Sequence, residues 1–269
     1  MRRAKIAAIA LVSAYGVLCL AVALGYRWFL YPAPRAARAP ELPPRAELLR
    51  IERPGTPPVF AIHAPAPPDA PTLVLFHGNG QDLADEVATV RAFHARGVGV
   101  LAVEYPGYGL ARDQRATEAS IDLAAAIAIE HLDALGVERA SRVVVGFSLG
   151  TGVAVEMLSR GLASRGVLLA PYTSMPRMVA RFVPIVPTGF LIGDAYDSLA
   201  TAPAIDAPVL VIHGDEDALI PLAMGERLAA ALPRATLHIV RGGHHNDLYA
   251  ADSSLFEVIV AFARGSDTD

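Results

Sequence analysis

A serine between two glycines constrains this chain more than any other feature. The segment Gly146-Phe147-Ser148-Leu149-Gly150 separates a strand-like run at 142–145 from a helix-like run at 151–160. A direct strand-to-helix turn brings the two elements very close together, and glycine has no Cβ atom to clash there. The serine hydroxyl at such a turn is lifted clear of the sheet, so Ser148 is a candidate nucleophile. Because a five-residue match is weak by itself, the prediction depends on the rest of the chain.

The rest of the chain alternates between predicted strands and helices. Short β-branched and aliphatic runs predict strands at 46–51, 59–64, 72–76, 98–104, 142–145, 166–169, 208–212 and 236–240. Helical patterns follow at 83–96, 117–135, 151–160, 222–232 and 253–264. This alternation predicts the α/β class, with a mostly parallel central sheet and helices on both faces. Residues 172–205 interrupt the alternation and predict a small helical cap.

Further polar residues follow other predicted strands, in the order that a serine nucleophile requires. Asp217 comes after the strand at 208–212, and His245 comes after the strand at 236–240. Because the carboxyl ends of parallel strands meet at one edge of a sheet, we expect both to reach Ser148. His245 would act as the base and Asp217 would orient it.

An oxyanion site is predicted at the same edge. The loop His77-Gly78-Asn79-Gly80 directly follows the strand at 72–76. Its backbone N–H at Asn79, with the N–H of Leu149 after the nucleophile, would stabilise a developing negative charge.

Two neighbouring residues compete for these roles. Asp215 is an alternative to Asp217, and His244 is an alternative to His245. Metal ligation by the two histidines lacks a spaced third ligand, so we expect neither a metal nor a cofactor.

The N-terminal segment is apolar enough to cross a membrane. Ile6 to Leu24 are nineteen residues without a charge, or about 28 Å of helix. Basic residues precede this run, and aromatic residues follow it as interfacial anchors would: Tyr26, Trp28, Phe29 and Tyr31. We therefore expect an uncleaved anchor at 1–30. The alternative is a cleaved signal peptide, because Ala21-Val22-Ala23 resembles a cleavage site.

Composition places limits on location and partners. Residues 31–45 are rich in proline and predict a stiff tether, followed by a domain at 46–269. Lys5 is the only lysine in a chain rich in Arg, Ala, Gly and Pro, which suggests a bacterium with a GC-rich genome. The short basic N-terminus favours a domain on the extracytoplasmic side of the inner membrane. The net charge of −4 argues against nucleic acid as a partner. Cys19 has no intramolecular partner, and we expect a monomer.

Five motifs in order resemble the α/β-hydrolase superfamily, and more narrowly its ABHD-type serine hydrolases with one N-terminal membrane helix. They are the HGNG loop at 77–80, the EYPGYG turn at 104–109, the GFSLG turn at 146–150, the GDEDALIP loop at 214–221 and the GHHND loop at 243–247. The resemblance implies a triad of Ser148, Asp217 and His245, with Asn79 and Leu149 as oxyanion donors. This chain has Glu104 where relatives often have Asp and Ala111 where they often have Ser.

The sequence therefore predicts a serine hydrolase that cleaves an ester or thioester through an acyl-enzyme. The predicted cap is apolar, which suits a small-molecule or lipid acyl substrate, although its side chains could instead pack the cap onto the domain: Met175, Met178, Phe182, Val183, Ile185, Val186, Phe190, Leu191 and Ile192. Amide or peptide hydrolysis and acyl transfer are alternatives on the same triad. A non-catalytic, membrane-tethered binding module is the alternative from another class.

Overall fold

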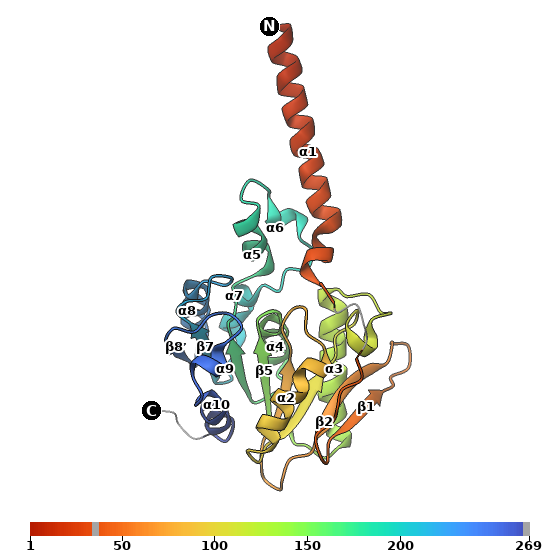
Figure 1. The fold of residues 1–269 in the computed structure, drawn as a ribbon, viewed down its shortest axis with the longest axis vertical. Helices are drawn as coiled ribbons and strands as arrows, with labels where there is room; N and C mark the ends of the chain where they lie inside the picture. Colours follow the sequence, from red (N-terminus) through yellow and green to blue (C-terminus); the bar gives the residue numbers. More distant parts are fainter. Residues whose placement is uncertain (34–37, 266–269) are drawn as a thin grey trace.

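A computed structural model describes residues 1–33 and 38–265. Residues 34–37, inside the predicted tether, and residues 266–269 lie outside the described residues. One sheet of eight strands runs in the order β1-β2-β4-β3-β5-β6-β7-β8 (Figure 1). β1 pairs antiparallel with β2, and β2 pairs antiparallel with β4. The six strands from β3 to β8 are parallel to one another. The strands are β1 Glu47–Ile51, β2 Val59–Ala64, β3 Thr72–Phe76, β4 Gly99–Val103, β5 Arg142–Phe147, β6 Arg165–Leu169, β7 Val209–Gly214 and β8 Ala235–Val240.

Helices cover both faces of this sheet. α2 Leu83–His94 and α10 Leu255–Ala263 pack on one face, and α3 Glu118–Ala134, α4 Leu149–Ser159 and α8 Leu222–Ala231 pack on the other. The remaining helical elements are α1 Arg2–Leu30, α5 Met175–Phe182, α6 Thr188–Leu191, α7 Ser198–Thr201, α9 Leu248–Ala251, and the 3-10 turns η1 Gly109–Ala111, η2 Arg139–Ser141 and η3 Ala202–Ala204. The predicted fold class is confirmed: all eight strands and five helices lie within two residues of their expected bounds.

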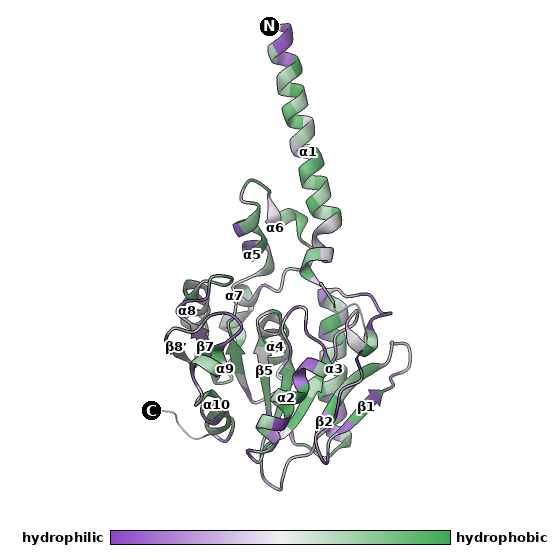
Figure 2. Ribbon diagram, viewed as in Figure 1, coloured by the Kyte–Doolittle hydropathy of each residue, from purple (hydrophilic) through white to green (hydrophobic). Residues whose placement is uncertain are grey.

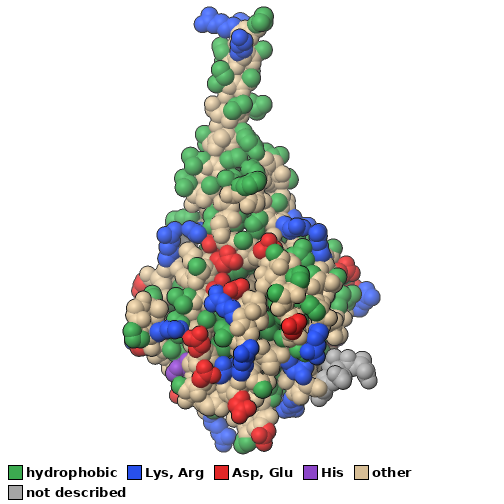
Figure 3. All heavy atoms as spheres, turned by 180° about the vertical axis from the view of Figure 1, so that it is seen from behind, with side chains coloured by type: hydrophobic (Ala, Val, Ile, Leu, Met, Phe, Trp, Pro, Cys, Tyr) green, Lys and Arg blue, Asp and Glu red, His purple; other side chains and the backbone are tan. Residues whose placement is uncertain are grey.

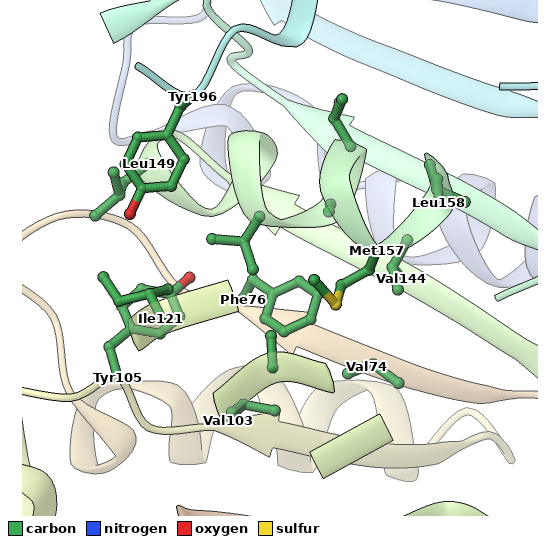
Figure 4. Close-up of a cluster of buried hydrophobic side chains, with 14 of the residues drawn as sticks. Val74, Phe76, Val103, Tyr105, Ile121, Val144, Leu149, Met157, Leu158 and Tyr196 are labelled. Carbon is green, nitrogen blue, oxygen red and sulfur yellow. The ribbon is translucent and has the colours of Figure 1, made fainter. Parts of the chain in front are cut away.

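The continuous apolar strands build two cores, because successive side chains point to opposite faces. Val74 and Phe76 of β3 belong to the core under α3 and α4. Leu73 and Leu75 belong to the core under α2 and α10. Figure 4 shows the first of these cores, with the side chains of β3, β4 and β5 packed against α3 and α4.

The turn between β5 and α4 has the close approach that the sequence predicts. Ser148 has φ +50°, a left-handed backbone conformation that is rare for a residue with a side chain. A Cβ atom on Gly150 would lie 2.1 Å from the carbonyl oxygen of Phe76, and one on Gly146 would lie 2.3 Å from that of Gly150. Only glycine fits at these two positions, so the helix begins directly above the sheet.

The cap and α1 project from the same end of the molecule (Figure 1). α1 has 29 residues, a best window of mean hydropathy 2.4, and no part of that window buried, so it is long and apolar enough to cross a membrane. Figure 2 shows that α1 is mostly apolar and that the tip of the cap beside it is apolar too, whereas α5 carries hydrophilic positions.

The close packing at Gly150 has a measurable consequence. We expect Gly150→Ala to destabilise the protein by at least about 2 kcal/mol, because the new methyl group forces the backbone apart. The melting temperature should fall by about 4 to 8 °C for a domain of this size. Gly189→Ala is the control, since its Cβ would meet nothing within 4 Å. Equal melting temperatures for the two variants would contradict the close approach.

Asp122 on α3 makes stability depend on pH. Burial, and then the carboxylates of Glu156 and Glu118, raise its pKa to about 8, against about 3.9 for an exposed aspartate. Between these values the folded protein keeps a proton that the unfolded chain releases, so stability falls as pH rises from about 4 to 8. Asp122→Asn should therefore raise the melting temperature by several degrees at pH 8 and much less at pH 5. Asp113→Asn, at a carboxylate that is 98% exposed, should leave it unchanged at both.

Candidate active site

Ser148, His245 and Asp217 form one chain of hydrogen bonds at the carboxyl ends of β5, β8 and β7. The Ser148 hydroxyl lies 3.0 Å from Nε2 of His245, and Nδ1 of His245 lies 2.7 Å from Oδ2 of Asp217. A carboxylate only accepts hydrogen bonds, so it places the imidazole proton on Nδ1 and leaves Nε2 free to accept the serine proton. All three residues are buried. The arrangement can deprotonate the serine hydroxyl and stabilise the imidazolium that results.

The loop after β7 holds Asp217 in its ionised form. Oδ1 of Asp217 accepts the backbone N–H groups of Leu219 and Ile220, at 2.9 and 2.8 Å. Burial by itself would raise the pKa of Asp217, but the hydrogen bonds from His245 and Ile220 outweigh it and lower the pKa. Buried His213 donates from Nε2 to the carbonyl of Ile220 and so ties the end of this loop to β7.

The two competing residues point elsewhere. The Asp215 carboxylate accepts hydrogen bonds from the Arg241 guanidinium and the Gly242 N–H, at 3.0 and 2.7 Å. The His244 ring bonds the carbonyl of Glu216 at the exposed surface. Neither belongs to the Ser148 hydrogen-bond chain. Within residues 1–33 and 38–265, no group of three His, Cys, Asp or Glu side chains is arranged to hold a metal ion.

The two expected oxyanion donors lie in the loop after β3 and at the start of α4. The Asn79 side chain accepts a hydrogen bond from the Tyr108 hydroxyl at 2.8 Å, which fixes the HGNG loop. The N–H groups of Asn79 and Leu149 donate to no acceptor within the described part of the chain. Leu149 is the first residue of α4, so the positive end of the helix dipole lies beside Ser148. The role of these two N–H groups as oxyanion donors remains a prediction.

Glu104 is one of the departures from the family pattern. Its side chain binds two loops and forms no hydrogen bond with Ser148, His245 or Asp217. Its Oε2 accepts the N–H groups of Leu83 and Leu110, and its Oε1 lies 3.5 Å from Nε2 of His77. Burial would lower the pKa of His77, but Glu104 outweighs it and raises the pKa. This buried pair supports the loop that carries Asn79.

A cavity of about 140 Å³ adjoins His245. This volume would hold a group about the size of benzene. Its lining is mostly apolar: Leu75, Phe76, Phe93, Val145, Phe147, Leu169, Leu248 and Tyr249, with His77, Gln81, Glu86, Thr89, His245 and Asn246. Burial raises the pKa of Glu86. Sequence reasoning missed Glu86 and Phe147 as lining residues. Glu86 has another acidic residue beside it in its helix, so nothing in the sequence singles it out. Phe147 directly precedes Ser148 in the GFSLG motif, and this position could have indicated it.

A larger hollow of about 690 Å³ lies at the other end of the sheet, lined by residues such as Pro71, Gly97 and Ser141. It adjoins the amino ends of β3, β4 and β5. Sites in open α/β sheets lie at the carboxyl ends, so this hollow is not the candidate active site.

The apolar residues of the cap differ in exposure. Met175, Met178, Val186 and Ile192 are buried, and all of these except Val186 belong to the core under α3 and α4. Val183 and Leu191 are half-buried, and Phe182, Ile185 and Phe190 are exposed. The two interpretations that the sequence leaves open therefore apply to different side chains.

Comparison with known proteins agrees with this fold. Residues 73–204 match the family model described as the alpha/beta hydrolase family. An uncharacterized protein of Mycobacterium tuberculosis is 33% identical over 66% of this chain and 63% of its own length. Human alpha/beta hydrolase domain-containing protein 17C is 29% identical over 68% of this chain and 55% of its own length. The chain thus matches less than two thirds of the length of these relatives.

Solved structures show the same architecture at lower identity. A puromycin-hydrolyzing peptidase of M. tuberculosis superposes with a TM-score of 0.68 at 20% identity, covering 82% of this chain and 39% of that one. The 2,6-dihydroxy-pseudo-oxynicotine hydrolase also has a TM-score of 0.68, at 14% identity, covering 82% of this chain and 68% of that one. Sheet order and the strand-to-helix turn define the class as an α/β fold of the hydrolase type. The chain belongs to the α/β-hydrolase superfamily, and its relatives include ABHD-type proteins.

The geometry predicts different effects for the two aspartates. Asp217→Asn should slow labelling of Ser148 by a fluorophosphonate about 10³- to 10⁴-fold, because the amide disturbs the imidazole tautomer. Asp215→Asn should change the rate less than threefold, since the Asp215 carboxylate bonds Arg241 and Gly242 and not His245. The measurement is the second-order rate of probe labelling. Equal losses in the two variants would reject the assignment of Asp217 as the orienting acid.

Proposed function

We propose that this α/β hydrolase cleaves a carboxylic ester or thioester with an apolar acyl group, through an acyl-enzyme on Ser148. The observation that carries the proposal is the hydrogen-bond chain from Ser148 through His245 to Asp217, with Ser148 at φ +50°. His245 takes the serine proton as the oxygen attacks the carbonyl, and later gives it to the leaving group. Water, activated by the same histidine, then releases the acid.

The N-terminal positive end of α4 and the N–H groups of Asn79 and Leu149 would stabilise the tetrahedral intermediate. Charge stabilisation of this kind typically contributes 10²- to 10³-fold per donor. All of these parts come from the chain itself, so the proposed reaction needs no cofactor.

The membrane helix and the cap support the choice of an apolar acyl substrate. We infer that α1 is an uncleaved anchor, because a residue before the possible cleavage site at Ala23 contacts the cap: the Tyr15 hydroxyl donates a hydrogen bond to the carbonyl of Ile185. After that site, Tyr26 and Arg27 bind Asp194 of the cap, and the Tyr31 hydroxyl bonds that of Tyr196. Cleavage after Ala23 would leave only the second set of contacts and would detach the domain from the bilayer. Placement of the domain on the extracytoplasmic side is part of the same proposal.

Amide hydrolysis is the second candidate. Of the solved structures that share the fold, one is named as a puromycin-hydrolyzing peptidase and another as a puromycin hydrolase, and amides need the same nucleophile, base and oxyanion donors. A non-catalytic binding module is less well supported, because such a module has no need for an aligned Ser148, His245 and Asp217.

Replacement of the nucleophile tests the proposal. Ser148→Ala should abolish fluorophosphonate labelling and reduce turnover of p-nitrophenyl esters by several orders of magnitude. Esters of increasing acyl length, tested alongside an amide series, should give a kcat/KM that rises with chain length. Ser159→Ala, at an exposed serine on α4, is the control and should retain activity. Full ester turnover by Ser148→Ala would reject the serine mechanism, and faster amide than ester cleavage would favour the second candidate.

A further inference from the structure

The tip of the cap, residues 182–193, is an exposed apolar segment. No residue between Arg181 and Asp194 carries a charge. Three large side chains of the tip face outward, with exposed fractions of 67% for Phe182, 68% for Ile185 and 93% for Phe190. Exposed apolar groups clustered in this way mark an interaction surface.

This cap tip lies beside α1 (Figure 1). The Tyr15 hydroxyl of α1 donates a hydrogen bond to the carbonyl of Ile185 at 2.9 Å. At the base of the cap, Asp194 accepts hydrogen bonds from Tyr26 and Arg27 of the same helix. The two contacts hold the cap tip along the helix over several turns.

The contact at Tyr15 sets the depth of the cap tip. Tyr15 lies midway along the uncharged stretch from Ile6 to Leu24, nine residues or about 13 Å from its domain end. If the bilayer stopped at Tyr15, only about 15 Å of apolar helix would remain, half of a hydrocarbon core. When α1 spans the bilayer, the cap tip therefore lies in the hydrocarbon as well.

The backbone of the cap tip suits this environment. Hydrocarbon offers no partner to a free N–H group, so backbone groups must bond internally. Several N–H groups of the tip bond carbonyls of the cap itself: those of Val183, Val186, Thr188, Phe190 and Ile192. Pro184 and Pro187 have no N–H group at all.

Charged residues lie where this insertion would end. Arg177 and Arg181 are exposed on α5, which leads into the cap tip. Asp194 is paired with Arg27. Trp28, next to this pair, is 84% exposed, as an interfacial anchor would be. Figure 3 shows hydrophobic side chains along α1 and on the part of the molecule next to it. The charged side chains lie on the α/β domain and at the N-terminal end of α1.

We propose that the cap tip inserts into the membrane leaflet that adjoins the domain, against α1, so that its partner is the hydrocarbon of the bilayer. The proposal rests on the membrane anchor proposed above. Arg177 and Arg181 then lie among the lipid headgroups. An acyl chain in that leaflet would reach, without crossing water, the cap that follows the carboxyl end of β6, next to the end of β5 that carries Ser148.

Depth-dependent quenching tests this insertion in the full-length protein. In a Cys19→Ser background, single cysteines are introduced by Phe190→Cys in the cap tip, Val12→Cys in α1 and Leu48→Cys on β1. Each is labelled with a nitrobenzoxadiazole dye and reconstituted into vesicles of phosphatidylcholine and phosphatidylglycerol with a doxyl quencher on the acyl chain. Circular dichroism and thermal unfolding confirm that each variant is folded.

The dye at position 190 should be quenched about as strongly as the dye at position 12, and the dye at position 48 should not be quenched. Quenching at 12 without quenching at 190 overturns the insertion while leaving the anchor in place. No quenching at either position overturns the anchor and the insertion together. Neither result depends on hydrolysis, so loss of the proposed activity is detected separately.

A charge in the cap tip tests the route of the substrate. Phe190→Asp should raise the KM for a long-chain ester dissolved in vesicles at least about 10-fold. It should change kcat/KM for a soluble short-chain ester less than twofold, since Phe190 is 93% exposed and does not line the cavity beside His245. Leu48→Asp is the matched control. An unchanged KM for the vesicle-bound ester would contradict entry from the leaflet.

Discussion

The close approach of α4 to the sheet is the constraint on which the rest of the site depends. The helix begins directly after Ser148, and Gly146 and Gly150 leave room for this only because neither has a side chain. The unusual φ of Ser148 costs about 1 to 3 kcal/mol in isolation. Its N–H bonds the carbonyl of Leu169, and its carbonyl accepts the Thr151 hydroxyl, so its neighbours hold it in place. The same turn lifts the hydroxyl toward His245 and places the N-terminal end of α4 beside Ser148.

A second constraint joins α1 to the α/β domain. Asp194 accepts hydrogen bonds from Tyr26 and Arg27 of α1 and from the N–H of Glu118 on α3. The Glu118 carboxylate in turn accepts the N–H groups of Ala195 and Tyr196. Burial would raise the pKa of Asp194, but its hydrogen bonds, led by Arg27, lower it. Removing one partner of such a pair leaves a buried charge without compensation. The hydrogen bonds of Asp194 therefore hold the cap in a fixed position relative to α1 and α3.

Local patterns predicted most of the fold. The β-branched runs and the helical periodicities gave element bounds within two residues, because burial on both faces of a parallel sheet leaves a continuous apolar signature. The order of nucleophile, acid and base followed from the loops after β5, β7 and β8. The cavity beside His245 was not predictable, since Glu86 is drawn into it by the packing of α2 and not by any local motif.

The sequence by itself determined the class of fold, the edge of the sheet where the candidate site lies and the presence of an apolar N-terminal helix. Each of these follows from periodicity or from the order of residues along the chain. Only the tertiary structure decided between neighbours: Asp217 over Asp215 and His245 over His244 as partners in the hydrogen-bond chain. Adjacent loop residues point in directions set by long-range contacts, such as that of Arg241 with Asp215. The same holds for the cap, where tertiary packing buries some of the apolar side chains, such as Met175 and Met178, and leaves others, such as Phe190, exposed.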